Sequence, residues 1–172
     1  MTLRRAFLWT FWGGLVLFAV VIALSLPLVL TAVPGGIGEH QAAGTAAEVD
    51  RIQAAWAAAG LYGQARNAMI GDLVFIGVFA TGCMLGGIWF MRSPVQRVRL
   101  LGVSALVAGL AFLITDYAET ICQFIQLTQG RGDDTLAGIA ATVRPTKMAA
   151  WIVGFLAILL AMMLDRKSRR GA

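Results

Sequence analysis

Four polar residues in a long apolar stretch of the sequence have the spacing of a single helix face. Asp116, Glu119, Gln123 and Gln126 follow one another at intervals of three, four and three residues, which places their side chains on one side of an α-helix. In a helix that crosses a membrane, an ionised carboxylate facing lipid is costly. We therefore expect this face to look into a helical bundle or a water-filled cavity, where binding or acid/base chemistry can take place.

A third carboxylate is expected at a similar depth. Asp72 lies twenty residues before Arg92, and Glu119 lies twenty residues after Arg99. These two arginines mark the inner ends of neighbouring apolar stretches. A rise of about 1.5 Å per helical residue therefore places both carboxylates about 30 Å from the inner surface, with Asp116 one turn deeper.

Cations are available at the same height. Arg144 and Lys147 flank Pro145 and are expected to open the last apolar helix, where two positive charges oppose the helix dipole. The carboxylates lie towards the C-terminal end of their own helix, where the dipole is unfavourable for negative charge. The cations and the carboxylates therefore stabilise one another when they lie opposite each other. We therefore expect a buried cluster of charges with further polar groups beside it: Asp72, Asp116, Glu119, Arg144 and Lys147, accompanied by Arg66, Asn67, Tyr117 and Gln123.

This cluster permits several interpretations. Three carboxylates and three cations can form an ion-pair network that only orients helices. They can instead line an outward-facing pocket, in which Arg144 and Lys147 hold the head group of an anionic or amphipathic molecule. A carboxylate that titrates indicates a small transporter or proton-coupled carrier. A lipid-modifying enzyme, with Asp116 and Glu119 as an acid/base pair, is less favoured because no phosphate loop or Ser/His arrangement accompanies them, and catalytic residues stay unknown.

The polar content below the cluster favours binding over transport. A transporter needs a polar path from Asp116 to the inner surface, and the sequence offers little there besides Thr81 and Ser104. We therefore expect a binding or accessory membrane protein, or a subunit of a larger membrane complex. Its expected partners are membrane lipids, a lipid-like small molecule and a second copy of the chain.

Composition excludes a water-soluble domain. The chain has 172 residues, of which 59% are hydrophobic and 13% charged, with a mean hydropathy of +0.78. Soluble domains are about 45–50% apolar and about 25% charged. Four apolar runs approach or exceed the roughly 20 residues that span a bilayer as a helix. We predict an all-α bundle of four transmembrane helices with an external amphipathic helix.

The predicted boundaries follow the apolar runs. The first run is too long for a cleaved secretory signal, so we interpret it as a signal anchor that Pro27 kinks near its outer end. The single membrane domain divides as follows: transmembrane helices at about 6–33, 67–91, 99–127 and 147–165, an external amphipathic segment at 34–66 and an external loop at 128–146.

The net charge of +5 is explained by basic residues that set the orientation of the chain in a membrane. The basic residues flank apolar runs, nine on one side and five on the other, which argues against nucleic-acid binding. By the positive-inside rule both termini are cytoplasmic. The nine inner residues are Arg4, Arg5, Arg92, Arg97, Arg99, Arg166, Lys167, Arg169 and Arg170.

The external segment has the signature of an amphipathic helix. Thr45 and Glu48 form a capping box, and apolar residues follow at helical spacing: Val49, Ile52, Trp56 and Ala59. We expect this helix to lie on the outer membrane surface or to cap the bundle. A shorter helix is expected at about 134–143.

The second and third apolar runs are expected to pack as a hairpin. The turn between them is short and contains Pro94, and short connections favour antiparallel neighbours. Gly82 and Gly86 form a GxxxG pair that permits close helix contact.

Residues that could hold a metal or haem are scarce. Cys83 and Cys122 are expected at different depths, too far apart for a disulfide. His40 is the single histidine, and its place after three glycines predicts a solvated or interfacial side chain. We expect no metal site and no cofactor.

Three segments carry a family resemblance. The sequences VPGGIGEHQAAGTAAEVDRIQ (33–53), GDLVFIG (71–77) and DYAET (116–120), with a lysine opening the last helix, resemble those of uncharacterised small four-helix inner-membrane proteins of proteobacteria. The resemblance covers most of the chain. It implies a multi-pass protein of a bacterial inner membrane and implies no activity.

Overall fold

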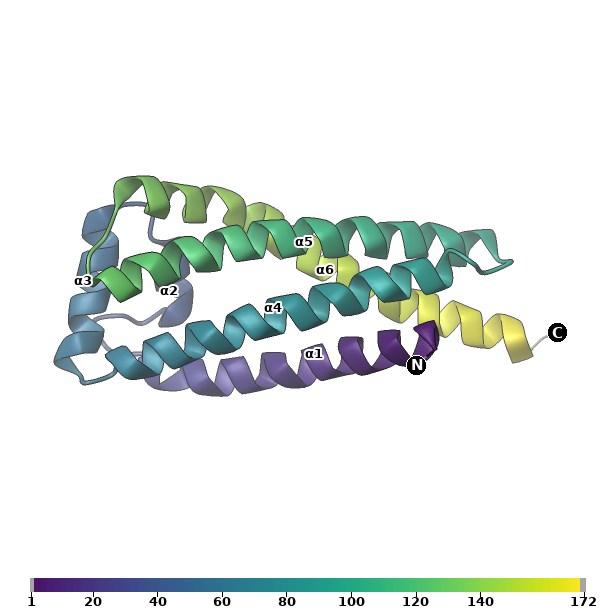
Figure 1. Ribbon diagram of the computed structural model, residues 1–172, viewed down its shortest axis with the longest axis horizontal. Coiled ribbons are helices and arrows are strands. Elements are labelled where there is room, and N and C mark those ends of the chain that lie inside the picture. Colours follow the sequence, from purple (N-terminus) through teal and green to yellow (C-terminus); the bar gives the residue numbers. More distant parts are fainter. Residues whose placement is uncertain (1, 171–172) are drawn as a thin grey trace. The chain divides into compact units, whose positions relative to one another are not determined.

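The chain folds into helices throughout the part that the structure describes. The computed structural model describes residues 2–170, with side chains as far as residue 166. Besides its helices, this part contains only an isolated bridge between Leu30 and Val33, so the predicted all-α class is confirmed. The elements are α1 (Leu3–Ser25), the 3-10 helix η1 (Leu26–Leu28), α2 (Ile37–Ala42), α3 (Ala46–Ala58), α4 (Tyr62–Phe90), α5 (Gln96–Gln129) and α6 (Asp134–Arg170) (Figure 1).

Four of these helices are long and apolar enough to cross a membrane. The candidate spans are Leu3–Leu28, Tyr62–Phe90, Gln96–Gln129 and Asp134–Arg166. Four apolar runs of this length were the main feature of the sequence, and the structure forms each of them as helix. The expected number of spanning helices is therefore confirmed by length and composition.

The last helix begins earlier than the sequence suggested. We expected an external loop at 128–146 with a separate short helix, but α6 runs without interruption from Asp134 through Pro145. Proline removes one backbone hydrogen bond and is tolerated where packing holds the helix on both sides; Ala140 before it and Ala150 after it are both buried. Arg144 therefore lies in a helix interior, and the prediction that it opens a helix is wrong; the same holds for Lys147.

The first helix ends earlier than predicted. The α-helix ends at Ser25, and Pro27 lies in the 3-10 turn that follows. Val29 is already extended, with a ψ of 107°. Because proline lacks a backbone N–H and disfavours the helical conformation of the residue before it, Pro27 ends α1 rather than kinking it.

The described chain divides into two compact units, which we treat separately. Unit 1 comprises Met1–Leu15, Ile76–Ile114 and Thr146–Ala172. Unit 2 comprises Val16–Phe75 and Thr115–Pro145. The long helices contribute residues to both units, whereas α2 and α3 belong wholly to unit 2.

Glycines allow close backbone contact within unit 1. A Cβ on Gly82 would lie 2.7 Å from the Cα of Phe11, and one on Gly87 would lie 2.7 Å from the carbonyl oxygen of Gly102. The second contact joins α4 to α5 beside their short turn, which confirms the predicted hairpin packing. Gly86, the other member of the GxxxG pair, faces Phe7 and Ile158 at similarly short distances. These helices thus approach as closely as their backbones permit.

Aromatic rings fill the rest of the core of unit 1. The ring of Phe79 packs edge-on against Phe112 with centroids 5.6 Å apart, and lies 5.8 Å from Phe11. Trp151 and Phe155 stack in parallel at 5.6 Å. Such arrangements stabilise apolar cores beyond the burial of area alone.

Unit 2 has its own apolar core around α3. The side chains of Val49, Ile52 and Trp56 are buried, which confirms three of the four predicted stripe positions; Ala59 is exposed and lies beyond the end of α3. The stripe packs on protein: on Leu28, Val33, Ala65, Ala68, Met69, Leu127 and Ala137. Within unit 2, Figure 1 shows α2 and α3 beside the ends of the long helices.

Polar contacts hold α3 and its flanking loops to α5 and α6. Asp50 accepts a hydrogen bond from the backbone N–H of Gly132 at 2.5 Å, and Asp134 accepts one from that of Ala46 at 2.7 Å. The hydroxyl of Tyr62 donates to the carbonyl oxygen of Leu127. Each of these bonds joins segments far apart in sequence. The first two hold α3 to the residues around the start of α6, and the third joins α4 to α5.

The predicted capping box starts α3. The hydroxyl of Thr45 accepts from the backbone N–H of Glu48 at 3.3 Å. The carboxylate of Glu48 accepts in return from the Thr45 hydroxyl and from the backbone N–H of Gly44. The box therefore satisfies a backbone donor at the helix start and one just before it.

Candidate functional site

Buried polar side chains are concentrated in unit 2. The described part has eight buried polar or charged residues, and seven of them belong to this unit. Five of the seven lie on α5, and we call them the polar column: Asp116, Glu119, Thr120, Gln123 and Gln126. The other two, His40 and Gln53, lie on α2 and α3.

Helical spacing places the polar column on one face of α5. Its five side chains are each at most 2% exposed, although charged residues are rarely buried in proteins. Their neighbours on the opposite side, such as Ile114 and Ile121, are exposed. The face predicted to look inward from the sequence spacing is therefore buried, and the apolar face is turned outward.

Thr120 joins two carboxylates at one end of the column. Its hydroxyl lies 3.2 Å from Oδ2 of Asp72 on α4 and 3.5 Å from Oδ1 of Asp116 one turn earlier on α5. A hydroxyl has a single proton, so it donates to one carboxylate at a time. The hydroxyl thus links α4 to α5 at a point where two acidic groups converge.

At the other end the column reaches the backbone of neighbouring segments. The amide of Gln123 donates to the carbonyl oxygen of His40 at 3.3 Å. The amide oxygen of Gln126 accepts from the backbone N–H of Asp133 at 3.0 Å, and its nitrogen donates to the carbonyl oxygen of Cys122. These glutamines connect α5 to α2 and to the start of α6.

His40 is buried, contrary to the expectation of a solvated or interfacial side chain. It has no exposed surface, and its ring packs on Trp56 with centroids 5.2 Å apart. Its Nε2 atom lies 3.3 Å from Nε2 of Gln53. Burial lowers the pKa of His40 from 6.5 to about 4, because a charged imidazole loses its hydration there.

Sequence reasoning missed Thr120, Gln53 and the burial of His40. Thr120 follows Asp116 by four residues and therefore shares its helix face, which was a readable signal. The burial of His40 had no such signal, because it contacts Trp56 and Gln123, which are distant in sequence. Gln53 has no comparable signal because its burial depends on the fold of residues 29–45.

The remaining predicted site residues occupy different surroundings. Arg66 and Asn67 are exposed on α4. The hydroxyl of Tyr117 donates to the carbonyl oxygen of Leu73 at 3.2 Å. Arg144 is half-buried in unit 2, with Nη2 4.0 Å from the position that a Cβ on Gly38 would take. Lys147 belongs to unit 1 and is 7% exposed.

The donor set of the column suits hydrogen bonding and charge recognition. Carboxylates accept from hydroxyl or ammonium groups, and the amides and the threonine hydroxyl both donate and accept. Within the described residues, no group of three or more His, Cys, Asp or Glu side chains is arranged to hold a metal ion. Cys83 and Cys122 are both free thiols.

Comparison with known proteins gives no matching family model, no matching curated protein and no matching solved structure.

Proposed function

We propose that this chain is a multi-pass protein of a bacterial inner membrane that binds the head group of an anionic or amphipathic molecule at the polar column of unit 2. The observation that carries the proposal is the concentration of buried polar side chains in this unit, seven of the eight in the described part. A buried polar site in a membrane protein suits a membrane lipid or lipid-like small molecule, because such a molecule combines a polar head group with an apolar body.

Exposed apolar side chains support the membrane location. Trp9 on α1 is 74% exposed, and Val107 on α5 and Met163 on α6 are exposed by more than half. Exposed apolar surface of this extent marks a membrane or partner interface. Lipid tails provide an apolar surrounding for all four long helices.

Exposed arginines support the proposed orientation. Unit 1 contains a single acidic residue, Asp165, and six exposed arginines: Arg4, Arg5, Arg92, Arg97, Arg99 and Arg166. The side chains of Lys167, Arg169 and Arg170 lie outside the described part. An excess of basic residues favours the cytoplasmic side, so we place the ends of the unit 1 helices that carry these arginines in the cytoplasm.

The composition of the column supports binding by complementary charges. Asp116 and Glu119 are buried carboxylates in a helix long and apolar enough to span a membrane, and such residues commonly mark functional sites. Arg144 offers a planar cation on α6 and makes no ion pair with any residue of the described part. Head groups with both donor and anionic atoms could use the carboxylates and the guanidinium together.

Unit 1, considered by itself, favours binding over transport. Apart from Lys147, its buried side chains in the described part are apolar. Glycines and aromatic rings pack them closely. A transporter or proton-coupled carrier requires a polar path on both sides of the membrane, and unit 1 contains no second polar column among its described residues.

The proposal is tested by measuring amphiphiles that co-purify with the protein. We would extract the wild type, Asp116→Asn, Glu119→Gln and the exposed-carboxylate control Glu48→Gln in mild detergent and quantify bound small molecules by native mass spectrometry. The first two variants keep side-chain shape and remove one charge each. We expect bound amphiphile per protein to fall at least tenfold in these variants and to stay unchanged in the control.

Two results would overturn the proposal. One is a wild-type protein that carries no amphiphile after a second detergent wash. The other is equal retention by all variants that remain folded, which would show that the column is a structural network. Circular dichroism and size-exclusion profiles establish which variants are folded.

A further inference from the structure

Residues 29–45, which we call the α2 segment, cross the polar column. The contact is direct, because Gln123 donates to the carbonyl oxygen of His40 in α2. The same segment approaches α6, because a Cβ added to Gly44 would lie 3.8 Å from the Cβ of Ala141 on that helix. The α2 segment therefore covers the column at Gln123.

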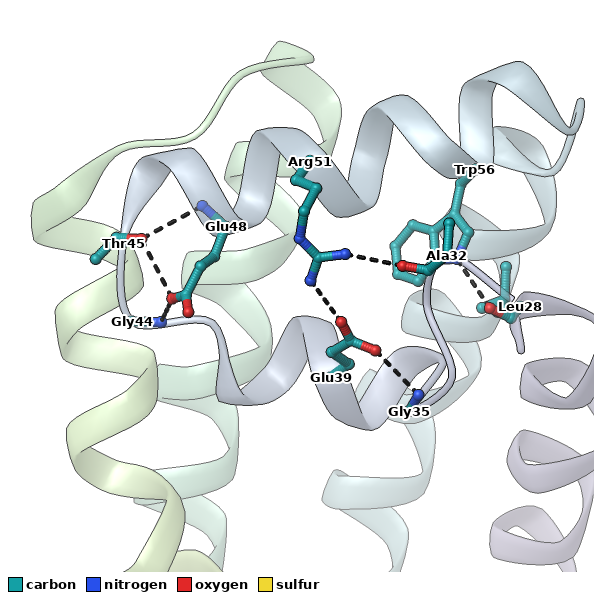
Figure 2. A network of polar contacts seen from close by, with 9 residues as sticks. All are labelled: Leu28, Ala32, Gly35, Glu39, Gly44, Thr45, Glu48, Arg51 and Trp56. Atoms are coloured by element: carbon teal, nitrogen blue, oxygen red, sulfur yellow. Dashed lines mark hydrogen bonds and ion pairs between the residues drawn. The ribbon is translucent and has the colours of Figure 1, made fainter. Parts of the chain in front are cut away.

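An exposed latch holds the α2 segment to α3. Arg51 on α3 donates to the carbonyl oxygen of Ala32 at 2.8 Å and to the carboxylate of Glu39 at 2.5 Å (Figure 2). The other carboxylate oxygen of Glu39 accepts from the backbone N–H of Gly35. The side chains of Arg51 and Glu39 are 51% and 25% exposed, and ion pairs this exposed are weak. The latch can therefore open and close readily.

The α2 segment is anchored at both of its ends. Before it, the indole N–H of Trp56 donates to the carbonyl oxygen of Leu28 at 3.0 Å, and both side chains are fully buried. At its other end, Thr45 caps α3. Gly36 has a φ of 53°, a conformation that glycine adopts without strain. Opening of the segment would break the contacts of His40 and keep these two anchors, so that α1 and α3 stay in place.

The contact of His40 with α3 is incompletely satisfied. Nδ1 of His40 and Oε1 of Gln53 are buried without a hydrogen-bond partner in the described part. Each such atom costs free energy relative to its hydrated state. The covered arrangement therefore contains a polar mismatch at His40, and a charge on this imidazole would add to its cost.

We propose that the α2 segment is a lid over the polar column and that protonation of His40 opens it. The lid would regulate access of the head group, so its biological meaning rests on the proposed binding function. Opening itself involves residues 29–45 and their contacts on α3, α5 and α6, and is measured without a ligand.

The direction of the pH effect follows from burial. The pKa of His40 in the covered state is about 4, whereas an exposed histidine has its ordinary value of 6.5. The open state therefore binds more protons, and lowering the pH through this interval favours opening. Above pH 6.5 both states carry a neutral imidazole, and the lid keeps its full stability.

Several other charged groups lie on the elements around His40 and belong in the test. Glu39 and Arg51 form the latch, Arg144 on α6 lies beside Gly38, and the column presents its carboxylates from α5. Glu39 also titrates in acid, so its contribution must be separated from that of His40 by a variant.

Nuclear magnetic resonance of labelled histidine measures the first step without any substitution. His40 is the single histidine of the sequence, so ¹³C,¹⁵N-histidine gives one set of imidazole signals in protein purified without a histidine tag. We expect the signals to remain those of a neutral ring at pH 6, where an exposed histidine is mostly charged. An imidazole that titrates near 6.5 with unchanged lid contacts would overturn the proposal.

Hydrogen exchange measures the opening. In wild-type protein, the exchange of α2 amides, corrected for intrinsic rates, should rise by up to about tenfold per pH unit between pH 6.5 and 4.5. His40→Gln should exchange at a pH-independent rate. Glu39→Gln, the matched control, should exchange faster at every pH and keep the wild-type slope.

The outcomes distinguish failure of the lid proposal from failure of the binding proposal. A slope that persists in His40→Gln, or one lost in Glu39→Gln, would assign opening to another group and overturn the lid proposal. The amphiphile measurement at neutral pH is independent of this result. A failed lid test therefore leaves the binding proposal standing, and a failed binding test leaves a pH-dependent lid to be explained.

Discussion

The hydroxyl of Thr120 on α5 donates a hydrogen bond to the carboxylate of Asp72 on α4, at 3.2 Å. It is also 3.5 Å from Asp116. Asp116 is buried and Asp72 is partly buried, so the loss of this donor removes a hydrogen bond from a carboxylate that water replaces only in part. Thr120 is therefore a point at which the stability and the charge balance of the column can be tested together.

Replacing this hydroxyl should destabilise the protein. Thr120→Val keeps the side-chain shape and removes a hydroxyl that donates to one of two carboxylates, so we expect a loss of about 1–3 kcal/mol. Thr128→Val is the matched control, because Thr128 is exposed near the end of the same helix and bonds only to the carbonyl oxygen of Ile125. Unfolding in a detergent titration measures both. Equal effects of the two substitutions would contradict a special role for Thr120.

The glycine contacts of unit 1 should tolerate no side chain. In Gly82→Ala the new Cβ would meet the backbone of Phe11 at 2.7 Å, and we expect a cost of about 1–3 kcal/mol from overpacking. Gly13→Ala provides the control, since no atom lies within 4 Å of its Cβ position. Because alanine is the better helix former by about 1 kcal/mol, this control should be neutral or stabilising. A neutral Gly82→Ala would show that these helices separate easily.

Local rules were sufficient for much of the fold. Apolar runs predicted the four long helices, and the spacing of Thr45 and Glu48 predicted the cap of α3, because both depend on residues close in sequence. Pro145 was misjudged, since its effect on a helix depends on packing around it. The buried state of His40 depends on Trp56 and Gln123, which the fold brings to it from distant positions, so no local pattern could establish it.

The candidate site was also predictable only where it depends on residues close in sequence. Helical periodicity placed Asp116, Glu119 and Gln123 on one face, and the structure buries all three. The expected participation of Arg66 and Asn67 assumed that residues of similar depth face the same way. Both are exposed, because depth along a helix says nothing about rotation around it.

The cap of α3 should contribute measurably to stability. Thr45→Ala removes the acceptor for the backbone N–H of Glu48, and loss of such a cap costs about 0.5–2 kcal/mol. Thr142→Ala removes an exposed threonine that bonds to its own helix and should change the unfolding midpoint little. A Thr45→Ala protein as stable as this control would show that tertiary contacts alone hold α3.

The latch between Glu39 and Arg51 should weaken only in strong acid. The hydrogen bond from Arg51 is the main cause that lowers the pKa of Glu39 below 4.5. Its contribution is therefore complete above pH 4.5 and is lost as the pH falls through the lowered value. A double-substitution cycle with Glu39→Gln and Arg51→Gln at pH 7 should give a coupling of about 1 kcal/mol or less. A larger coupling would indicate a latch too strong for the proposed lid.

Cysteine labelling at the two ends of α5 should determine the orientation of the chain. Gln96 and Gln129 begin and end this helix, and both are exposed. In a variant without Cys83 and Cys122, the basic bias predicts that Gln129→Cys reacts with a membrane-impermeant maleimide in intact cells, while Gln96→Cys reacts only after permeabilisation. The reversed pattern would invert the topology and place the polar column towards the cytoplasm. Reaction of both residues in intact cells would show that α5 does not separate two compartments.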